Sequence, residues 1–288
     1  MAEQQQPNLS RFLAANYETV KNLHPGEGRR KWRLRVAQWF FALSDADKAA
    51  YAQLPPVSED EADEAPYTTD DDPLDAISTD APGLGVVLRT DFSDESAWQT
   101  FLAKLKDAES EFAAEVDAPM DAEGEEMDED EEDDEEEAAG SAPIFSVVNE
   151  ASAHARLEGI SNLAALRRLN DVDVRRIPDP PSGTKRIKPP NRLVDFHGWQ
   201  EVYTGKRVWV YDAKSNQDLS VRVVSQQSAE SVYGTATADS WRARVTHICE
   251  LQVNLASGAM SIDFGGTDRW DYPERVRNMA EAEQQNGA

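Results

Sequence analysis

Charge is distributed very unevenly along this chain, and that distribution constrains its fold more than any other feature. Residues 1–55 carry 8 basic and 5 acidic side chains, residues 56–140 carry 3 basic and 32 acidic ones, and residues 141–288 carry 18 of each. A stretch with such an excess of one charge repels itself and buries too little apolar surface to fold alone. The sequence therefore predicts two folded parts, near neutral or basic, separated by acidic segments.

The remaining composition argues against several classes of protein. No apolar run approaches the ~20 residues that a membrane span needs. The first ten residues are polar, unlike those of a signal peptide. A single cysteine, Cys249, allows neither an internal disulfide nor a thiolate zinc cluster. We therefore expect a protein of the nucleus or cytoplasm that is not secreted and has no membrane partner, metal or cofactor.

Residues 8–53 show the apolar periodicity of helices. Apolar side chains recur at intervals of three and four residues on both sides of a break at Pro25-Gly26, which predicts two helices. The first set is Leu9, Phe12, Leu13, Tyr17, Val20 and Leu23, and the second is Trp32, Val36, Trp39, Phe40 and Leu43. Ser44, with Asp47 three residues later, predicts the N-cap of a short third helix that ends before Pro55-Pro56.

The end of this segment, FFALSDADKAAY, follows an aromatic-x-x-Leu-Ser-x-x-x-Lys-x-x-Tyr pattern, and Phe12 and Val20 fall in register with it. Over about 45 residues the segment resembles a degenerate high-mobility-group (HMG) box, a three-helix DNA-binding module. The resemblance implies a core of Phe12, Val20, Phe40, Leu43 and Tyr51. It implies phosphate contacts by Arg29, Arg30, Lys31, Arg33, Arg35 and Lys48. The two prolines cut off the family's long third helix, and a plain helical bundle with a solvated basic face is the alternative.

The rest of the chain predicts an α+β fold. Residues 54–83, with five prolines and two acidic clusters, read as a disordered linker. Residues 84–278 predict one domain with an antiparallel β-sheet, interrupted by a disordered acidic insertion at 119–142 and followed by a flexible tail at 279–288. Strands are expected at 85–90, 144–148, 172–177, 206–212 and 219–225, and helices from 93 to about 112 and over 151–169.

The clearest strand signal lies at residues 244–255. Apolar residues there alternate strictly with mostly polar ones, which is typical of an antiparallel strand beside a core. Ser257-Gly258 then predicts a turn into a second strand at 260–264. This reading places His247 and Cys249 on one apolar face, where a buried histidine and an inert thiol are far commoner than a nucleophilic pair.

The stretch LRTDFSDESAW at residues 88–98 resembles the opening of a family of small, functionally uncharacterised proteins found mainly in bacteria. The later NLASGAMSIDF at 254–264 is loosely similar to that family's closing segment. The resemblance implies a strand that ends ahead of a helix bearing a tryptophan, and it brings no activity. Asp91 and Ser93 suit a turn and a helix N-cap at such a junction.

The acidic block at 121–137 contains 14 acidic residues among 17. Such blocks are typical of eukaryotic nuclear proteins, and this one is a candidate site for basic partners such as histones, or a competitor of DNA for the basic helix. A spacer that binds nothing is the alternative. The candidate binding residues are Glu125, Glu126, Asp128, Glu129, Asp130, Glu131, Glu132, Asp133 and Asp134.

No catalytic constellation is evident, so we expect a non-enzymatic interaction protein. Its helical module would bind DNA or a protein partner weakly, and its acidic tract would bind basic proteins. Two alternatives remain open. The α+β domain could be an enzyme or a small-molecule binder using Asp212, Asp239, Arg242 and Asp263, or the protein could be an adaptor that makes no DNA contact.

Overall fold

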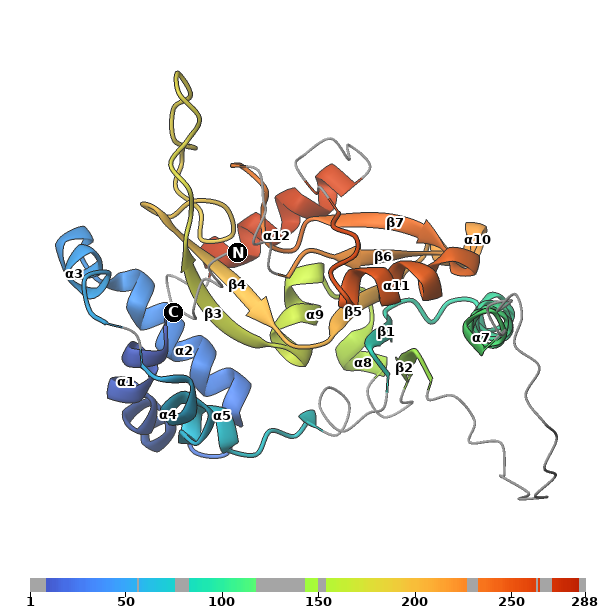
Figure 1. The fold of residues 1–288 in the computed structure, drawn as a ribbon, viewed down its shortest axis with the longest axis horizontal. Helices are drawn as coiled ribbons and strands as arrows, with labels where there is room; N and C mark the ends of the chain where they lie inside the picture. The colour runs from blue at the N-terminus through green and yellow to red at the C-terminus, as the bar shows by residue number, and fades with distance from the viewer. Residues whose placement is uncertain are drawn as a thin grey trace, which may run out of the picture.

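The computed structural model describes residues 9–55, 57–75, 83–117, 143–149, 154–226, 233–262, 264 and 271–284. Helices gather at one end of the molecule and a β-sheet fills the other (Figure 1). The helical end contains α1 (Ser10–Leu23), α2 (Arg29–Ala42), α3 (Asp45–Tyr51), α4 (Glu59–Asp63) and α5 (Pro66–Thr69). The predicted α+β class is confirmed.

A five-stranded sheet forms the centre of the other end, in the order β2-β1-β5-β6-β7. Its second strand, β1, pairs in parallel with both β2 and β5, whereas β5, β6 and β7 pair antiparallel. The antiparallel sheet of the prediction therefore exists only in part, because β1, α7 and β2 form a crossover unit. The strands are β1 (Gly85–Arg89), β2 (Phe145–Val148), β5 (Arg207–Tyr211), β6 (Ser220–Val224) and β7 (Ser240–Arg244).

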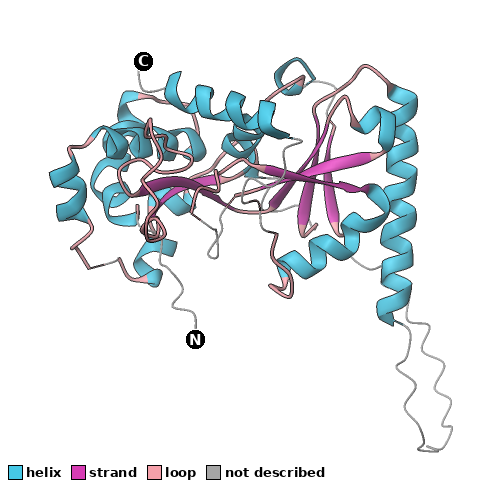
Figure 2. Cartoon of the chain, turned by 90° about the horizontal axis from the view of Figure 1, so that it is seen from above, coloured by secondary structure: helices cyan, strands magenta, loops and turns pink. Residues whose placement is uncertain are grey.

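Side chains alternate between the two faces of this sheet and therefore contribute to two separate cores. Val86 and Val208 point toward the core shared with the helical end. Val87 and Trp209 point toward a second core, which is closed by α7 (Glu95–Asp117) and α11 (Ile248–Ala256). Figure 2 shows α7 standing at the end of the molecule opposite to the helical end.

A two-stranded sheet joins the helical end to the rest. β3 (Asp171–Arg176) and β4 (Trp199–Thr204) pair antiparallel, and β4 was not predicted. Trp199 of β4 packs on Phe40 with ring centroids 4.9 Å apart, so α2 shares its core with this hairpin. The helical end is thus part of one folded body.

The predicted helix at 151–169 is divided into α8 (His154–Leu157) and α9 (Asn162–Leu169). Gly159 between them has φ of 59°, a conformation that suits glycine and ends α8. Ser161 then caps α9 by accepting a hydrogen bond from the Ala164 N–H. A short helix α10 (Ser215–Asp218) connects β5 to β6.

The prediction of a strand at 244–255 is wrong. β7 ends at Arg244, a 3₁₀ turn covers Val245–His247, and α11 follows. Ile248, Cys249, Gln252 and Leu255 are the buried residues of α11, and their spacing is that of one helix face. The hairpin predicted with 260–264 is therefore absent among the described residues of that segment.

The predicted linker and tail also differ from the structure. Residues 57–75 contain α4 and α5 rather than a disordered linker, while 76–82 lie outside the described residues. The tail is helical to residue 284 in α12 (Tyr272–Gln284), where Ala282 is buried. α12 docks through polar contacts, such as the Asn162 N–H donating to Glu274 and Arg192 donating to the Ala282 carbonyl. The acidic insertion at 119–142 lies wholly outside the described residues, as does Asp263.

Candidate functional site

Three of the four arginines of α2, Arg29, Arg30 and Arg33, point into the molecule. Arg29 donates two hydrogen bonds to the Asp75 carboxylate, at 2.9 and 2.7 Å, and a third to the Asp70 carbonyl. Arg30 forms ion pairs with Asp72 at 2.6 Å and with Asp75 at 3.0 Å. Burial raises the pKa of Asp75, but hydrogen bonds from Arg29 and the Asp72 N–H lower it below its ordinary value. These pairs fold the acidic segment 70–75 onto α2.

Arg33 reaches further into the body of the protein. Its guanidinium donates to the carbonyl of Tyr67 at 3.0 Å and to the carbonyl of Val172 at 3.2 Å, which ties α2 to α5 and to β3. Arg29, Arg30 and Arg33 are all buried. Their donors are directed at protein groups, a placement that leaves phosphate contact by them without structural support.

The other three predicted nucleic-acid contacts are placed differently from one another. Arg35 forms a bidentate pair with Glu27, at 2.6 and 2.7 Å, on the surface. Lys31 is exposed, whereas Lys48 is buried. DNA binding by these six residues stays a prediction, and the structure does not bring them onto one exposed face.

The predicted helices and most of the predicted small core are present. Val20 and Phe40 are fully buried, while Phe12, Leu43 and Tyr51 are half-buried. α3 is only seven residues long, as the two prolines indicate. The acidic candidates from Glu125 to Asp134 lie outside the described residues. α7, which leads toward them, stands far from α2 in both views (Figures 1 and 2).

A groove of about 820 Å³ lies between α2, α3 and the turn before β4, and we call it the α2–α3 groove. Basic, aromatic and apolar side chains dominate its lining. Its residues are His24, Arg35, Gln38, Trp39, Phe41, Ala42, Leu43, Ser44, Asp45, Lys48, Phe196 and His197. Trp39, which the sequence analysis places in the periodic apolar set of the second helix, is 38% exposed here. Aromatic and basic residues of this kind commonly anchor protein partners.

Lys48 of the α2–α3 groove has an unusual environment for a lysine side chain. Its ammonium donates to the Leu43 carbonyl at the end of α2 and lies 5.3 Å from the centre of the Phe196 ring. Among the residues that the structure describes, no carboxylate forms an ion pair with it. Burial lowers the pKa of Lys48, although Asp45 and Asp47 act in the opposite direction. Asp45 lies 3.6 Å from the His197 imidazole.

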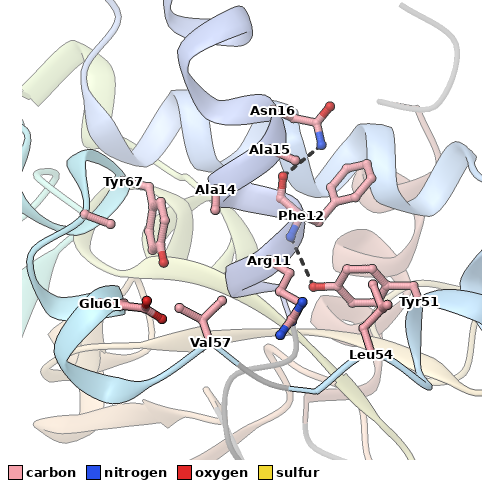
Figure 3. A pocket seen from close by; sticks show the side chains of 11 residues that line it. Arg11, Phe12, Ala14, Ala15, Asn16, Tyr51, Leu54, Val57, Glu61 and Tyr67 are labelled. Carbon is pink, nitrogen blue, oxygen red and sulfur yellow. Dashed lines mark hydrogen bonds between the residues drawn. The ribbon is translucent and has the colours of Figure 1, made fainter.

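A second groove, of about 800 Å³, lies on the other side of α3 between α1 and α4, and we call it the α1–α4 groove. Figure 3 shows Phe12, Tyr51 and Leu54 on one side and Tyr67 and Glu61 on the other. The Tyr67 hydroxyl is buried without a hydrogen-bond partner among the described residues. The charged residues in its described lining, Arg11 and Glu61, have opposite signs, so this groove does not select a charged ligand.

The RTDFSD motif closes the junction between β1 and α7. Arg89 is buried against the rings of Phe92 and Trp98 and donates to Glu95 at 2.7 Å. Asp91 accepts hydrogen bonds from the Ser93 N–H and from Asn216, which hold its pKa below the ordinary value although burial raises it. Asp94, rather than Ser93, accepts from the Ala97 N–H in the first turn of α7. These contacts account for the motif as a structural junction.

The polar residues of the enzyme alternative are spread over separate ion pairs. Asp212 pairs with Arg242 at 2.6 Å and Arg222 at 3.2 Å, whereas Asp239 pairs with Arg275 of α12. Neither groove described above is lined by them. His247 is exposed and Cys249 is buried, so they do not form a pair on one face, and burial raises the pKa of the Cys249 thiol to about 12.

In comparisons with known proteins, no protein-family model, curated protein or solved structure matches the chain. Within the described part of the chain, no helix is long and apolar enough to cross a membrane. The described residues also contain no group of three or more His, Cys, Asp or Glu side chains placed to hold a metal ion.

Phe196 and His197 of the α2–α3 groove could not be found from the sequence. They lie about 150 residues from α3 along the chain, and the turn that brings them there precedes a strand that was not predicted. The sequence analysis did name Lys48, but as a phosphate contact, because it matches the ending of the HMG pattern. Nothing in the sequence indicated that the aspartates of the proline-rich stretch pair with α2, because they appeared there only as acidic residues of a predicted linker.

Proposed function

We propose that this chain is a non-enzymatic interaction protein whose α2–α3 groove binds a segment of a protein partner. The observation that carries the proposal is the contrast within α2. Its buried arginines are engaged by aspartates and backbone carbonyls, while Trp39 of the same helix is exposed in a groove with Phe41 and Phe196. Among the alternatives from the sequence, this favours the adaptor that makes no DNA contact.

A peptide library displayed on phage tests the proposal without knowledge of the partner. The immobilised full chain selects binders, and each is then measured against Trp39→Arg and against Trp241→Arg. The two tryptophans are matched, with exposures of 38% and 37%, but Trp241 lies on β7. We expect peptides that lose at least about tenfold in affinity on Trp39→Arg alone, a loss typical of an interface hot spot. Peptides that are insensitive to Trp39→Arg, or an empty selection, would contradict the proposal.

The acidic block gives a second candidate activity, the binding of basic proteins such as histones. It is supported by 14 acidic residues in 17 positions. Replacing these acidic residues with glutamine and asparagine should abolish salt-dependent binding of core histones. Equal histone binding by the wild type and this variant would rule the activity out.

A further inference from the structure

The α2–α3 groove has a chemical preference that its overall shape does not reveal. Lys48 has only 2% of its surface exposed, and it lines the groove. A buried charge is normally paired with an opposite charge, because transfer from water costs several kcal/mol or more. Here the ammonium has one carbonyl and the face of one aromatic ring as its observed partners. A lysine ammonium has three hydrogens to donate.

The other charges that face the groove come from three elements. Arg35 of α2 is engaged by Glu27, and His24 follows the end of α1. Asp45, at the start of α3, is the one carboxylate in the described lining, and it lies nearest to His197 rather than to Lys48. With Arg35 matched by Glu27, the lining leaves the Lys48 ammonium and two histidines against one carboxylate. An anionic ligand complements this set and a cationic one does not.

The aromatic side chains restrict the ligand further. Trp39, Phe41 and Phe196 give the groove apolar walls, and Phe196 also forms the surface against which the ammonium lies. A small hydrated anion gains nothing from such walls, whereas a carboxylate attached to an aromatic or aliphatic group uses both features.

We propose that the α2–α3 groove binds a carboxylate-bearing apolar segment of a partner protein, with the carboxylate on the Lys48 ammonium and the apolar group between Trp39, Phe41 and Phe196. This inference rests on the proposed function and names the chemistry of the partner. It also assigns Lys48 a role other than the phosphate contact implied by the HMG resemblance.

Two small probes of the same shape test the preference on the full chain: phenylacetate, which carries a carboxylate, and the neutral phenylacetamide. Binding is followed by the indole N–H signal of Trp39 in ¹⁵N-labelled protein, assigned with Trp39→Phe. We expect phenylacetate to shift this signal with at least about tenfold higher affinity than phenylacetamide, since hydrogen bonds to charged groups are the stronger ones. Equal affinities, or no shift with phenylacetate, would overturn the proposal.

Lys48→Met is the variant that assigns the preference to this side chain, and Lys31→Met on the exposed side of α2 is its control. We expect the advantage of phenylacetate to disappear in Lys48→Met and to persist in Lys31→Met. A preference that survives Lys48→Met in a folded protein would contradict the assignment. If Lys48→Met does not fold, the comparison of the two probes on the wild type still decides. Peptides that depend on Trp39 but are indifferent to carboxylates would retain the proposed function and exclude this inference.

Discussion

The two ends of the molecule are closed by different kinds of interaction. Beyond the five-stranded sheet, α7 contributes Trp98 and Phe101 to an apolar core that also holds Trp209 of β5 and the buried face of α11. At the helical end, the segment at residues 70–75 is held to α2 by aspartates that meet Arg29 and Arg30. An excess of negative charge in one stretch can therefore direct folding when arginines elsewhere in the chain pair with it.

The largest effect on stability is expected in the apolar core. Trp209 is fully buried, and its indole N–H donates to Gln252 at 2.8 Å. Trp209→Ala should lower the free energy of unfolding by about 4 kcal/mol, because it leaves a cavity and an unpaired amide. Urea denaturation measures this, with the exposed Trp241→Ala as control. A loss below about 1 kcal/mol would show that the sheet end is not packed as described.

The paired charges should come next. Arg30→Ala leaves the buried Asp72 without its ion pair, and we expect a loss of about 3 kcal/mol in the same assay. Lys31→Ala, one residue along α2 but exposed, should change stability by less than about 0.5 kcal/mol. If the two variants are equally stable, Arg30 is a surface residue and its ion pairs do not hold the helical end together.

A smaller and pH-dependent effect is expected at Asp239. Burial raises its pKa to about 6, although Arg275 and the Ala236 N–H lower it. Because this lies above the value of about 3.9 for an unfolded chain, protonation favours the native state. The contribution is complete below about pH 4 and is lost as the pH rises through 6.

Asp239→Asn should remove this dependence. The stability of the wild type relative to Asp239→Asn should fall by on the order of 2 kcal/mol from pH 4 to pH 7. Denaturation of both proteins across this range is the measurement. A difference that is independent of pH would mean that Asp239 is ionised throughout.

The smallest effect concerns the start of α3. The Ser44 hydroxyl accepts a hydrogen bond from the Asp47 N–H at 3.2 Å, as the sequence predicts. Ser44→Ala should cost about 1 kcal/mol, and Ser44→Asp should retain most of the stability. Thermal unfolding distinguishes the two variants. Equal losses in both would show that α3 does not depend on its cap.

The sequence was most informative where local rules decide the structure. The periodicity before and after Pro25-Gly26 predicted α1 and α2, and β1, β5 and β6 were expected close to where they lie. At residues 244–255 two periodicities coincide, since Ile248, Cys249 and Leu255 satisfy a helix face while the whole run also alternates. Tertiary packing of α11 on the sheet selects the helix.

What the sequence could not predict depends on partners that are distant along the chain. The local sequence of residues 70–75 does not predict their pairing with Arg29 and Arg30. An acidic stretch with prolines is therefore predicted to be disordered. The α2–α3 groove needs Phe196 beside Lys48, which depends on the β3-β4 pairing and on the packing of α2 against it. The prediction of an exposed basic face on α2 failed for the same reason, because the charges of its buried arginines are paired with groups on other segments of the chain.

The buried arginines of α2, Arg29, Arg30 and Arg33, stabilise the fold through aspartates and backbone carbonyls, and we predict that they do not contact phosphate. Fluorescence anisotropy of a short labelled DNA duplex tests this prediction most directly, with the full chain and with a variant whose acidic residues in 121–137 are replaced by glutamine and asparagine. We predict no saturable binding by either protein at about 50 mM salt, where phosphate contacts are strong. Steeply salt-dependent binding that emerges in the variant would contradict this prediction and show that the acidic block competes with DNA for α2.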